Sequence, residues 1–489
     1  MQYLLNNLQS YFLNIYLLIP FVFGVSIACF TFLKNPVYIR RVANLLSLVC
    51  LIFSFIMFTC ENNTVSSIFN IDFEFNRIPA VFSFILSFIF FLISVFSKTF
   101  IHKMHRIYRA SLFIIYGLLN AITISDSILF VYACIIWLLL MFYFLFTSYS
   151  DEEKIKKHIF YQLIFDMIVV SLSLFLAGYD LYRYFVLNEI PFNFSLIPDN
   201  LYHINPVSAI IGFGGLFIVI LKLFNFFPFT GKTLSFSNKI NPLIQNISVL
   251  SCMIAGSIFT IKLYSVFAYL FYDFQEIISL YLIINLVYFI ILSFRQDSLI
   301  KFINSVIPAF ISISLFNILI FKENGAVIYL YSMLVNIFTY CFTGFVFNVL
   351  IQKIKTDNPC ELKKISNKNK ILKLFVITSL LNTMGIPLFC IFSSRFLTFT
   401  NIFSVDFETM FMSIIPAVLI IGCFVLALNV LNILYKILVA PVEISGSEDY
   451  LCKNQIVVLT LLLFATLITG LFARDICSLF TGIFVIGNI

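Results

Sequence analysis

Long apolar segments recur along the whole chain, and short polar links separate them. Most are about 20 residues long, which is enough for one α-helix to cross the hydrocarbon layer of a bilayer. In the run IPAVFSFILSFIFFLISVFS at 78–97, apolar residues do not alternate with polar ones, as they would in a strand of a membrane barrel. Because backbone polar groups inside lipid need internal partners, the pattern predicts helices.

We therefore expect an all-α integral membrane protein with one polytopic domain, 1–489, and about fourteen transmembrane helices. The expected helix cores are 10–33, 42–60, 78–97, 110–125, 127–147, 159–178, 206–229, 242–270, 276–294, 302–321, 325–352, 374–395, 411–436 and 454–473. The polar segment 353–373 is rich in Lys and Asn, and we interpret it as a cytoplasmic linker between two helices.

The positions of positive charge support this layout. Of the 30 Lys and Arg residues, 23 fall in alternate links, four in the other links and three inside helices. Lys and Arg concentrate in cytoplasmic loops of membrane proteins, so this asymmetry predicts that both termini face outward. The net charge of +7 therefore reports topology and does not indicate a nucleic-acid partner.

The composition argues against a catalytic centre in this chain. It is 61% hydrophobic and 11% charged, with only 4 His. The 11 Cys lie mostly within apolar runs and lack paired metal spacing, so we interpret them as small core residues. No dinucleotide, haem or cluster motif is present, so we expect no cofactor and no metal.

Ionisable residues within apolar helices are costly, and each is therefore a candidate for an ion pathway. Four such residues stand out: Asp166, Lys222, Lys262 and Arg395. Lys262 lies toward one end of its helix, where its ammonium could reach the membrane–water interface and have only a structural role. Asp166 could pair with a base in the bundle or make a local polar contact, and the sequence leaves both open.

Two helices carry signals for an interruption. Pro228 and Gly231 follow Lys222, and Gly385 and Pro387 precede Arg395. Proline removes a backbone donor, and interrupted helices at corresponding positions in two halves point to a transport path. An ordinary kink is the alternative interpretation.

Several short motifs, in this order, resemble one family: the antiporter-like proton-channel subunits of respiratory complex I and the matching D-type subunits of multisubunit Na⁺/H⁺ antiporters. The motifs are Phe226-Phe227-Pro228-Phe229 after Lys222, Gln296-Asp297 with Lys301-Phe302-Ile303, Gly325-Ala326-Val327-Ile328, Gly385-Ile386-Pro387 and Phe392-Ser393-Ser394-Arg395-Phe396. The resemblance covers residues from about 80 to 440.

The resemblance implies fourteen helices in which helices 4–8 (110–270) and 9–13 (276–436) are inverted repeats, with helices 7 and 12 broken. It also implies a proton relay of ionisable side chains. Lys222 and Arg395 match two relay positions, but the helix 5 glutamate position falls at Ala133 or Cys134 and the helix 8 lysine position near Ala255. Arginine does not release its proton in proteins, so the relay is degenerate.

Three functions remain open at this stage. The chain could be a membrane subunit of a complex that translocates protons or monovalent cations, and Lys222→Ala would then abolish flux. It could be a structural subunit of NADH:quinone oxidoreductase or a multisubunit antiporter, without its own flux, and Lys222→Ala would then leave assembly intact. It could also be an unrelated polytopic transporter. For the first two we expect other membrane subunits as partners and a bacterial inner membrane, with the mitochondrial inner membrane as the alternative.

Overall fold

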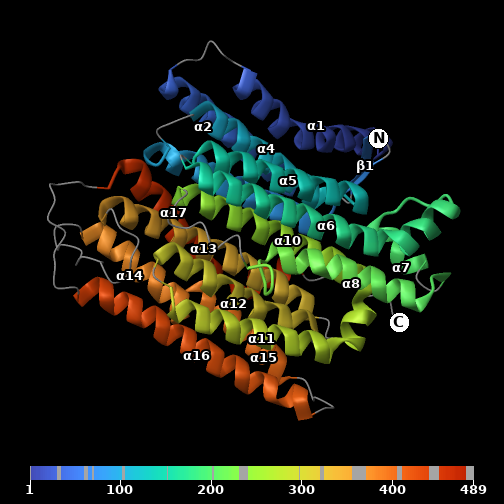
Figure 1. Ribbon diagram of the computed structural model, residues 1–489. Helices are drawn as coiled ribbons and strands as arrows, with labels where there is room; N and C mark the ends of the chain where they lie inside the picture. Colours follow the sequence, from blue (N-terminus) through green and yellow to red (C-terminus); the bar gives the residue numbers. More distant parts are fainter. Residues whose placement is uncertain are drawn as a thin grey trace. The chain divides into compact units, whose positions relative to one another are not determined.

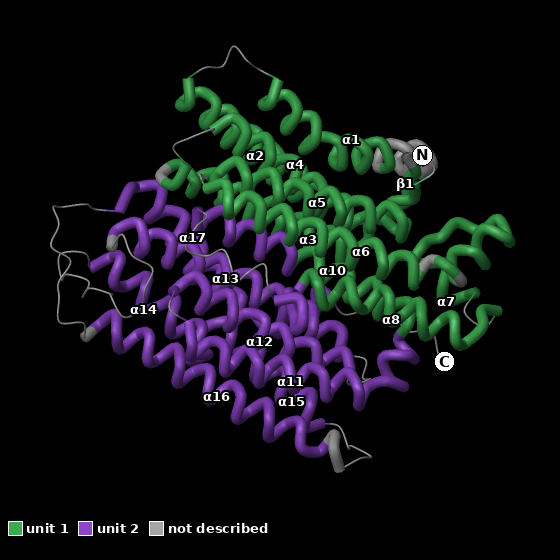
Figure 2. Tube along the Cα trace, in the orientation of Figure 1, with its two compact units in different colours: residues 1–223, 254–267 green, residues 224–253, 268–489 purple. Residues whose placement is uncertain are grey.

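The fold is described from a computed structural model of the chain. The structure describes residues 2–29, 35–59, 64–68, 71–101, 105–150, 152–200, 203–230, 241–296, 298–319, 324–354, 370–404, 410–439 and 451–480. In this part of the chain the regular structure is helical apart from one β-hairpin and two isolated bridges. The chain divides into two compact units, shown in Figure 2.

Unit 1 comprises residues 1–223 and 254–267. Its elements are α1 (Gln2–Cys29), α2 (Pro36–Thr59), β1 (Thr64–Ile68), β2 (Ile71–Phe75), α3 (Arg77–Phe96), the 3-10 turn η1 (Ser97–Thr99), α4 (His105–Ile124), α5 (Ile128–Ser148), α6 (Glu153–Leu187), η2 (Phe194–Leu196), α7 (Ile197–Asn200), α8 (Pro206–Leu223) and the 254–267 part of α10 (Pro242–Asp273). Within it, α4 packs against α1 and α5, and α6 packs along α8 (Figure 1).

Unit 2 comprises residues 224–253 and 268–489. Besides the ends of α10, it contains α11 (Gln275–Phe294), α12 (Leu299–Leu319), α13 (Gly325–Ile354), α14 (Lys370–Met384), α15 (Cys390–Phe403), α16 (Met410–Val439), α17 (Lys453–Leu471) and α18 (Ala473–Phe480). Within this unit α12 packs against α11, α13 and α15, and every α12 side chain except Lys301 is buried.

Thirteen helices of the described residues are long and apolar enough to cross a membrane. The expected all-α membrane fold is therefore confirmed, whereas the count of fourteen stays a prediction. The expected core at 374–395 is the one not among the thirteen. It coincides with α14 and α15, of 15 and 14 residues. At 1.5 Å per residue each spans only about 22 Å, too short to cross the hydrocarbon layer alone.

The helix ends near the predicted breaks differ from the expected cores. The core expected at 206–229 ends at Leu223, because Asn225 has a positive φ of 54° and Pro228 follows within the turn at 224–229. Between α14 and α15, Gly385 has a φ of 81° and Pro387 is exposed. Gly231 and most of the linker 353–373 lie outside the described residues, and the broken helices and inverted repeats remain predictions.

Sequence analysis did not predict the antiparallel hairpin of β1 and β2 between α2 and α3. In β2 the side chains alternate, because Phe73 and Phe75 are buried while Asp72 and Glu74 are partly exposed. Phe73 and Phe75 join a core cluster with residues of α1. Phe73 also bridges to Ser125, and Ser127 bridges to Asn193, so the α4–α5 connection lies between β2 and the segment before η2.

Candidate functional site

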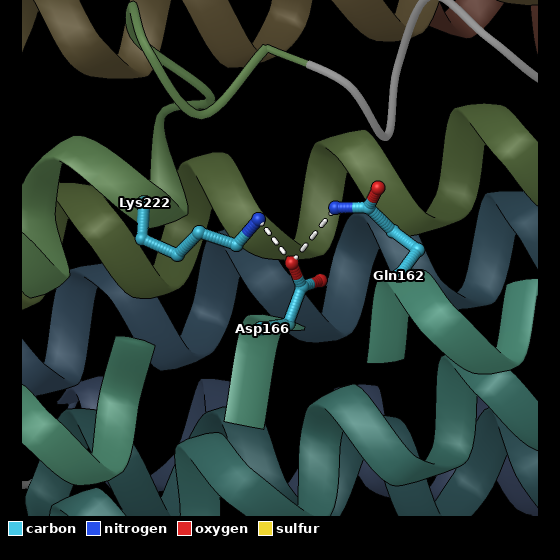
Figure 3. A network of polar contacts seen from close by, with 3 residues as sticks. All are labelled: Gln162, Asp166 and Lys222. Atoms are coloured by element: carbon cyan, nitrogen blue, oxygen red, sulfur yellow. Dashed lines mark hydrogen bonds and ion pairs between the residues drawn. The ribbon is translucent and has the colours of Figure 1, made fainter. Parts of the chain in front are cut away.

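The structure brings together two of the four ionisable residues singled out in the sequence. Lys222 lies in the last turn of α8, and its ammonium forms an ion pair with the Asp166 carboxylate of α6 (Figure 3). The two residues are only 3% and 1% exposed. Moving a charge out of water costs several kcal/mol. Each of these buried side chains can therefore stay charged only because the other supplies the opposite charge.

Close packing of α6 and α8 places the two side chains within reach of each other. Gly215 of α8 lies against the backbone of α6, where an added Cβ would come within 2.7 Å of the Ser173 carbonyl oxygen and 2.9 Å of the Ala177 nitrogen. Such contacts are too short for any side chain, so glycine lets the two backbones approach. Lys222 lies two turns beyond Gly215, on the same face of α8, and therefore meets α6 near Asp166.

Gln162 completes this group. It lies one turn before Asp166 on α6, and its Nε2 donates to Asp166 Oδ1 at 3.0 Å. Lys222 Nζ contacts the same carboxylate oxygen (Figure 3). The Phe165 ring centroid lies 5.9 Å from Lys222 Nζ, which adds a cation–π contact. We name Gln162, Asp166 and Lys222 the α6–α8 polar group.

Lys262, the third candidate, has backbone partners. It lies in α10 and donates to the carbonyl oxygens of Ile122, at 2.9 Å, and Ser125. Since α4 ends at Ile124, these carbonyls belong to a helix C-terminus, which lacks internal donors and carries a partial negative charge. Lys262 therefore caps α4.

Arg395, the fourth candidate, caps a helix in unit 2. From α15 its Nη1 donates to the Met384 carbonyl oxygen at 2.8 Å, and its Nη2 lies 3.4 Å from that of Thr383. These two residues end α14. The guanidinium carbon lies 4.7 Å from the Phe310 ring centroid. Gly385 leaves room for this contact, because an added Cβ would lie 2.8 Å from Arg395 Nη1.

A further cation was missed in the sequence. The expected core 110–125 leaves Arg109 in the preceding link, but Arg109 lies inside α4, is 2% exposed and donates to the Ser94 carbonyl oxygen at 2.6 Å. Ser94 is in the last turn of α3, so Arg109 is a third cation on helix C-terminal carbonyls. Starting the predicted helix one turn earlier, at the polar residues from His105, would have placed it within a membrane span.

These contacts separate the cations into two kinds. Arg109, Lys262 and Arg395 are held by main-chain carbonyls, which cannot take up or release a proton near neutral pH. Lys222 is held by a carboxylate, which can. Of these four cations, Lys222 is thus the one whose charged group forms an ion pair with a carboxylate among the described residues.

The segment after α8 is also fixed, within unit 2, by polar contacts from α11. Asn285 accepts from the Phe227 nitrogen at 2.9 Å, and the Tyr281 hydroxyl donates to the Phe227 carbonyl oxygen. Both polar groups of the residue before Pro228 therefore have a partner on one helix. Sequence analysis gave no role to Asn285, which is fully buried.

The interior of unit 2 holds neutral polar contacts between its helices. Asn336 of α13 donates to Ser314 Oγ of α12 at 3.0 Å, and Asn317 of α12 donates to Thr398 Oγ1 of α15 at 3.0 Å. Tyr340 of α13 donates to Asn304 at 2.9 Å. Amides and hydroxyls can orient water and bind each other, but they do not change charge near neutral pH.

Outside the helices, Glu74 of β2 lies in an acidic environment. Burial raises the pKa of its carboxyl above the ordinary value. The carboxylate of Asp126 adds to this rise, Lys262 opposes it, and Asp72 adds a smaller amount. Since the folded-state pKa is raised, Glu74 favours folding below its unfolded pKa, and this contribution is lost as pH rises through the folded-state pKa.

We expect Glu74→Gln to raise the thermal unfolding midpoint of the detergent-purified protein at neutral pH. The amide keeps the shape of the protonated acid and removes the cost of ionisation. The difference from wild type should disappear below about pH 4, where the wild-type side chain is protonated in both states. A midpoint that is equally changed at pH 4 and pH 7 would contradict this account.

The comparisons with known proteins agree with this architecture. Neither a family model nor a curated protein matches the chain. Among solved structures, a chain of the respiratory complex I from Thermus thermophilus with bound NADH matches with a TM-score of 0.79 and 16% identity, over 96% of this chain and 98% of that one. A chain of the membrane-bound sulfane sulfur reductase, an archaeal respiratory membrane complex, matches with a TM-score of 0.81 and 12% identity, over 96% of each chain.

A chain of the Mrp complex from Dietzia sp. also matches, with a TM-score of 0.79 and 12% identity, over 97% of this chain and 96% of that one. The thirteen candidate spans and these matches make the chain a multi-pass helical membrane protein. It shares its fold with chains of a respiratory complex I, an archaeal respiratory complex and an Mrp complex. At the level of the fold, the resemblance expected from the sequence is confirmed.

Proposed function

We propose that this chain is a membrane subunit of a multisubunit complex that translocates protons or monovalent cations, and that it works with a degenerate relay. The observation that carries the proposal is the buried Asp166–Lys222 ion pair. The fold supports it, since three chains with this fold come from membrane complexes. Its partners are then other membrane subunits, and its ion is H⁺ or a monovalent cation.

The pair can respond to a proton because its two charges depend on each other. A proton that arrives on the Asp166 carboxylate removes the negative charge and leaves the Lys222 ammonium without its counter-ion. A buried ammonium without a counter-ion is strongly disfavoured, so Lys222 must then release a proton or reorient. Either response moves positive charge away from Asp166. In this scheme Asp166, from α6, supplies the carboxylate that Ala133 and Cys134 cannot supply.

Lys262 and Arg395 remain part of the proposed pathway as fixed positive charges. Their carbonyl partners hold each one in place, and arginine keeps its proton, so we assign them an electrostatic role. Pro228, Gly231, Gly385 and Pro387 would mark the two helix breaks of the inverted repeats 110–270 and 276–436. The linker 353–373 would lie in the cytoplasm of a bacterial cell with both chain termini outside.

The neutral interior of unit 2 favours one alternative. The contacts of Asn317 and Asn336 join amides and hydroxyls, and Arg395 is a helix cap. A structural subunit of NADH:quinone oxidoreductase or of a multisubunit antiporter, without flux of its own, would need no more than this. It would belong to a bacterial inner membrane or, alternatively, a mitochondrial inner membrane.

The test is Asp166→Asn in the complex purified from its native membrane through a tag on this chain and reconstituted into vesicles. The amide keeps the shape and the hydrogen bond from Gln162 but cannot bind a proton at neutral pH. We expect ion flux, followed with a pH-sensitive or cation-sensitive dye, to fall to background when it is expressed per assembled complex. Asp273→Asn, the same change at an exposed carboxylate at the end of α10, is the matched control. Normal flux in Asp166→Asn would favour the structural alternative.

A further inference from the structure

One face of α6 leads from its exposed end to the buried ion pair. His158, Gln162 and Asp166 are spaced four residues apart, so they lie above one another on the same face of the helix. Their exposure falls along this row, because His158 is exposed, Gln162 is half-buried and Asp166 is 1% exposed. Gln162 is already hydrogen-bonded to Asp166 at 3.0 Å.

The row starts near the charged N-terminal end of α6. Glu152, Glu153, Lys154, Lys156 and Lys157 are exposed and charged, and they precede a segment that is apolar except for Tyr161, Gln162 and Asp166 up to Val170. His158 therefore lies at the boundary between the charged end and the apolar span. Eight residues at 1.5 Å each put Asp166 about 12 Å deeper than His158 along the helix axis, which is most of the way to the middle of a hydrocarbon layer of roughly 30 Å.

We propose that His158 collects protons for the ion pair, and that His158, Gln162 and Asp166 form a proton-access row along α6. This inference rests on the proposed function and assigns the route by which Asp166 exchanges protons with water. It places the entrance on the side of the membrane where α6 begins. The three residues have distinct roles in the row.

The chemistry of the row is that of proton transfer through water. The His158 imidazole accepts a proton from the aqueous phase on its unprotonated ring nitrogen. It passes a proton to a chain of water molecules along this face, and the last water passes one to an Asp166 carboxylate oxygen, so His158 returns to its neutral form. Asp166 becomes neutral, and Lys222 loses its counter-ion. Gln162 does not titrate; by donating to Oδ1 it fixes the carboxylate within reach of the entering proton.

The other side of Asp166 offers no matching row on α6. The positions four and eight residues after Asp166 are Val170 and Leu174, which are apolar. The polar row on this helix therefore approaches Asp166 from the His158 end. A surface histidine without such a role would tolerate substitution without effect on flux.

The experiment is His158→Ala in the same purified and reconstituted complex, assayed for flux with and without added imidazole. We expect flux to fall on the order of tenfold, because the group that accepts and donates the proton at the entrance of the row has been removed. Imidazole should restore much of it by carrying protons to the exposed position in place of the missing side chain. Lys156→Ala is the matched control, since Lys156 is exposed in the same turn but points to the other side of the helix. Wild type with the same imidazole corrects for its effect on the pH gradient.

Each outcome distinguishes the row from the proposed function. Loss of flux in His158→Ala with recovery in imidazole supports the row, and Asp166→Asn should not recover in imidazole. Unchanged flux in His158→Ala, together with lost flux in Asp166→Asn, overturns the row and leaves the proposed function standing. Unchanged flux in Asp166→Asn overturns both. Equal loss in His158→Ala and Lys156→Ala would show a general effect of surface charge and would also overturn the row.

Discussion

Lys222→Met is expected to destabilise the protein by about 3–5 kcal/mol, because it leaves the Asp166 carboxylate buried without its ammonium partner. The double variant Lys222→Met with Asp166→Asn should recover most of this loss. It removes both charges together, and the asparagine oxygen still accepts the hydrogen bond from Gln162. The measurement is the thermal unfolding midpoint of the detergent-purified complex for the two single variants and the double variant, analysed as a double-mutant cycle.

The same three variants decide whether the pair serves stability alone. If the proposed function holds, the double variant regains stability but has no flux, because neither position can carry a proton. Flux that returns with stability in the double variant would show that the charges are dispensable for transport. A Lys222→Met protein as stable as wild type would contradict the buried pair itself.

Arg395→Met is expected to give the second large effect, on the connection between α14 and α15. The carbonyl oxygens of Thr383 and Met384 lose their charged donor, and a hydrogen bond to a charged group contributes about 1.5–3 kcal/mol. Arg395→Lys should fall between the two, because lysine keeps the charge but lacks the planar fork that reaches two carbonyls and stacks on Phe310. Hydrogen exchange of the amides at 385–390 and the unfolding midpoint would measure both effects.

Measurements of ion flux in Arg395 variants distinguish a helix cap from a residue that takes part in transport. If Arg395 acts as a fixed charge, Arg395→Lys keeps most of the flux despite its lower stability. Arg395→Met removes the charge and should lose more flux than its loss of folded protein accounts for. An Arg395→Met protein that keeps flux in proportion to the protein that remains folded would show that Arg395 is a helix cap without an electrostatic role in transport.

Much of the fold follows from the sequence because the membrane restricts the choices. A run of about 20 apolar residues in lipid has few alternatives to a helix, so the expected cores coincide with observed helices. The hairpin at 64–75 was missed because its strands are five residues long and lie in a polar link. The end of α8 was placed too late because Phe226 and Phe227 continue the apolar run, whereas the backbone turns at Asn225.

The sequence predicted the charged residues of the candidate site but not their partners. Asp166 and Lys222 stand out as charges in apolar helices, but their pairing depends on the close approach of α6 and α8 at Gly215. Lys262 and Arg395 stand out in the same way, yet their partners are main-chain carbonyls, which any residue supplies and no pattern marks. A sequence can therefore identify a costly charge more easily than the group that compensates for it.

The three helix caps become complete at different times while the chain is being synthesised. Each cation comes later in the chain than the carbonyl it covers: Arg109 by 15 positions, Arg395 by 11 and Lys262 by 140. The first two arrive with the next helix to be made. The C-terminus of α4, however, emerges from the ribosome long before α10 has been synthesised. Until then, water must donate the hydrogen bonds to its carbonyl oxygens. The α4–α5 connection thus reaches its final state only after more than half of the chain has entered the membrane. A chain truncated before residue 262 should leave that connection open to a water-soluble thiol reagent directed at a cysteine introduced there.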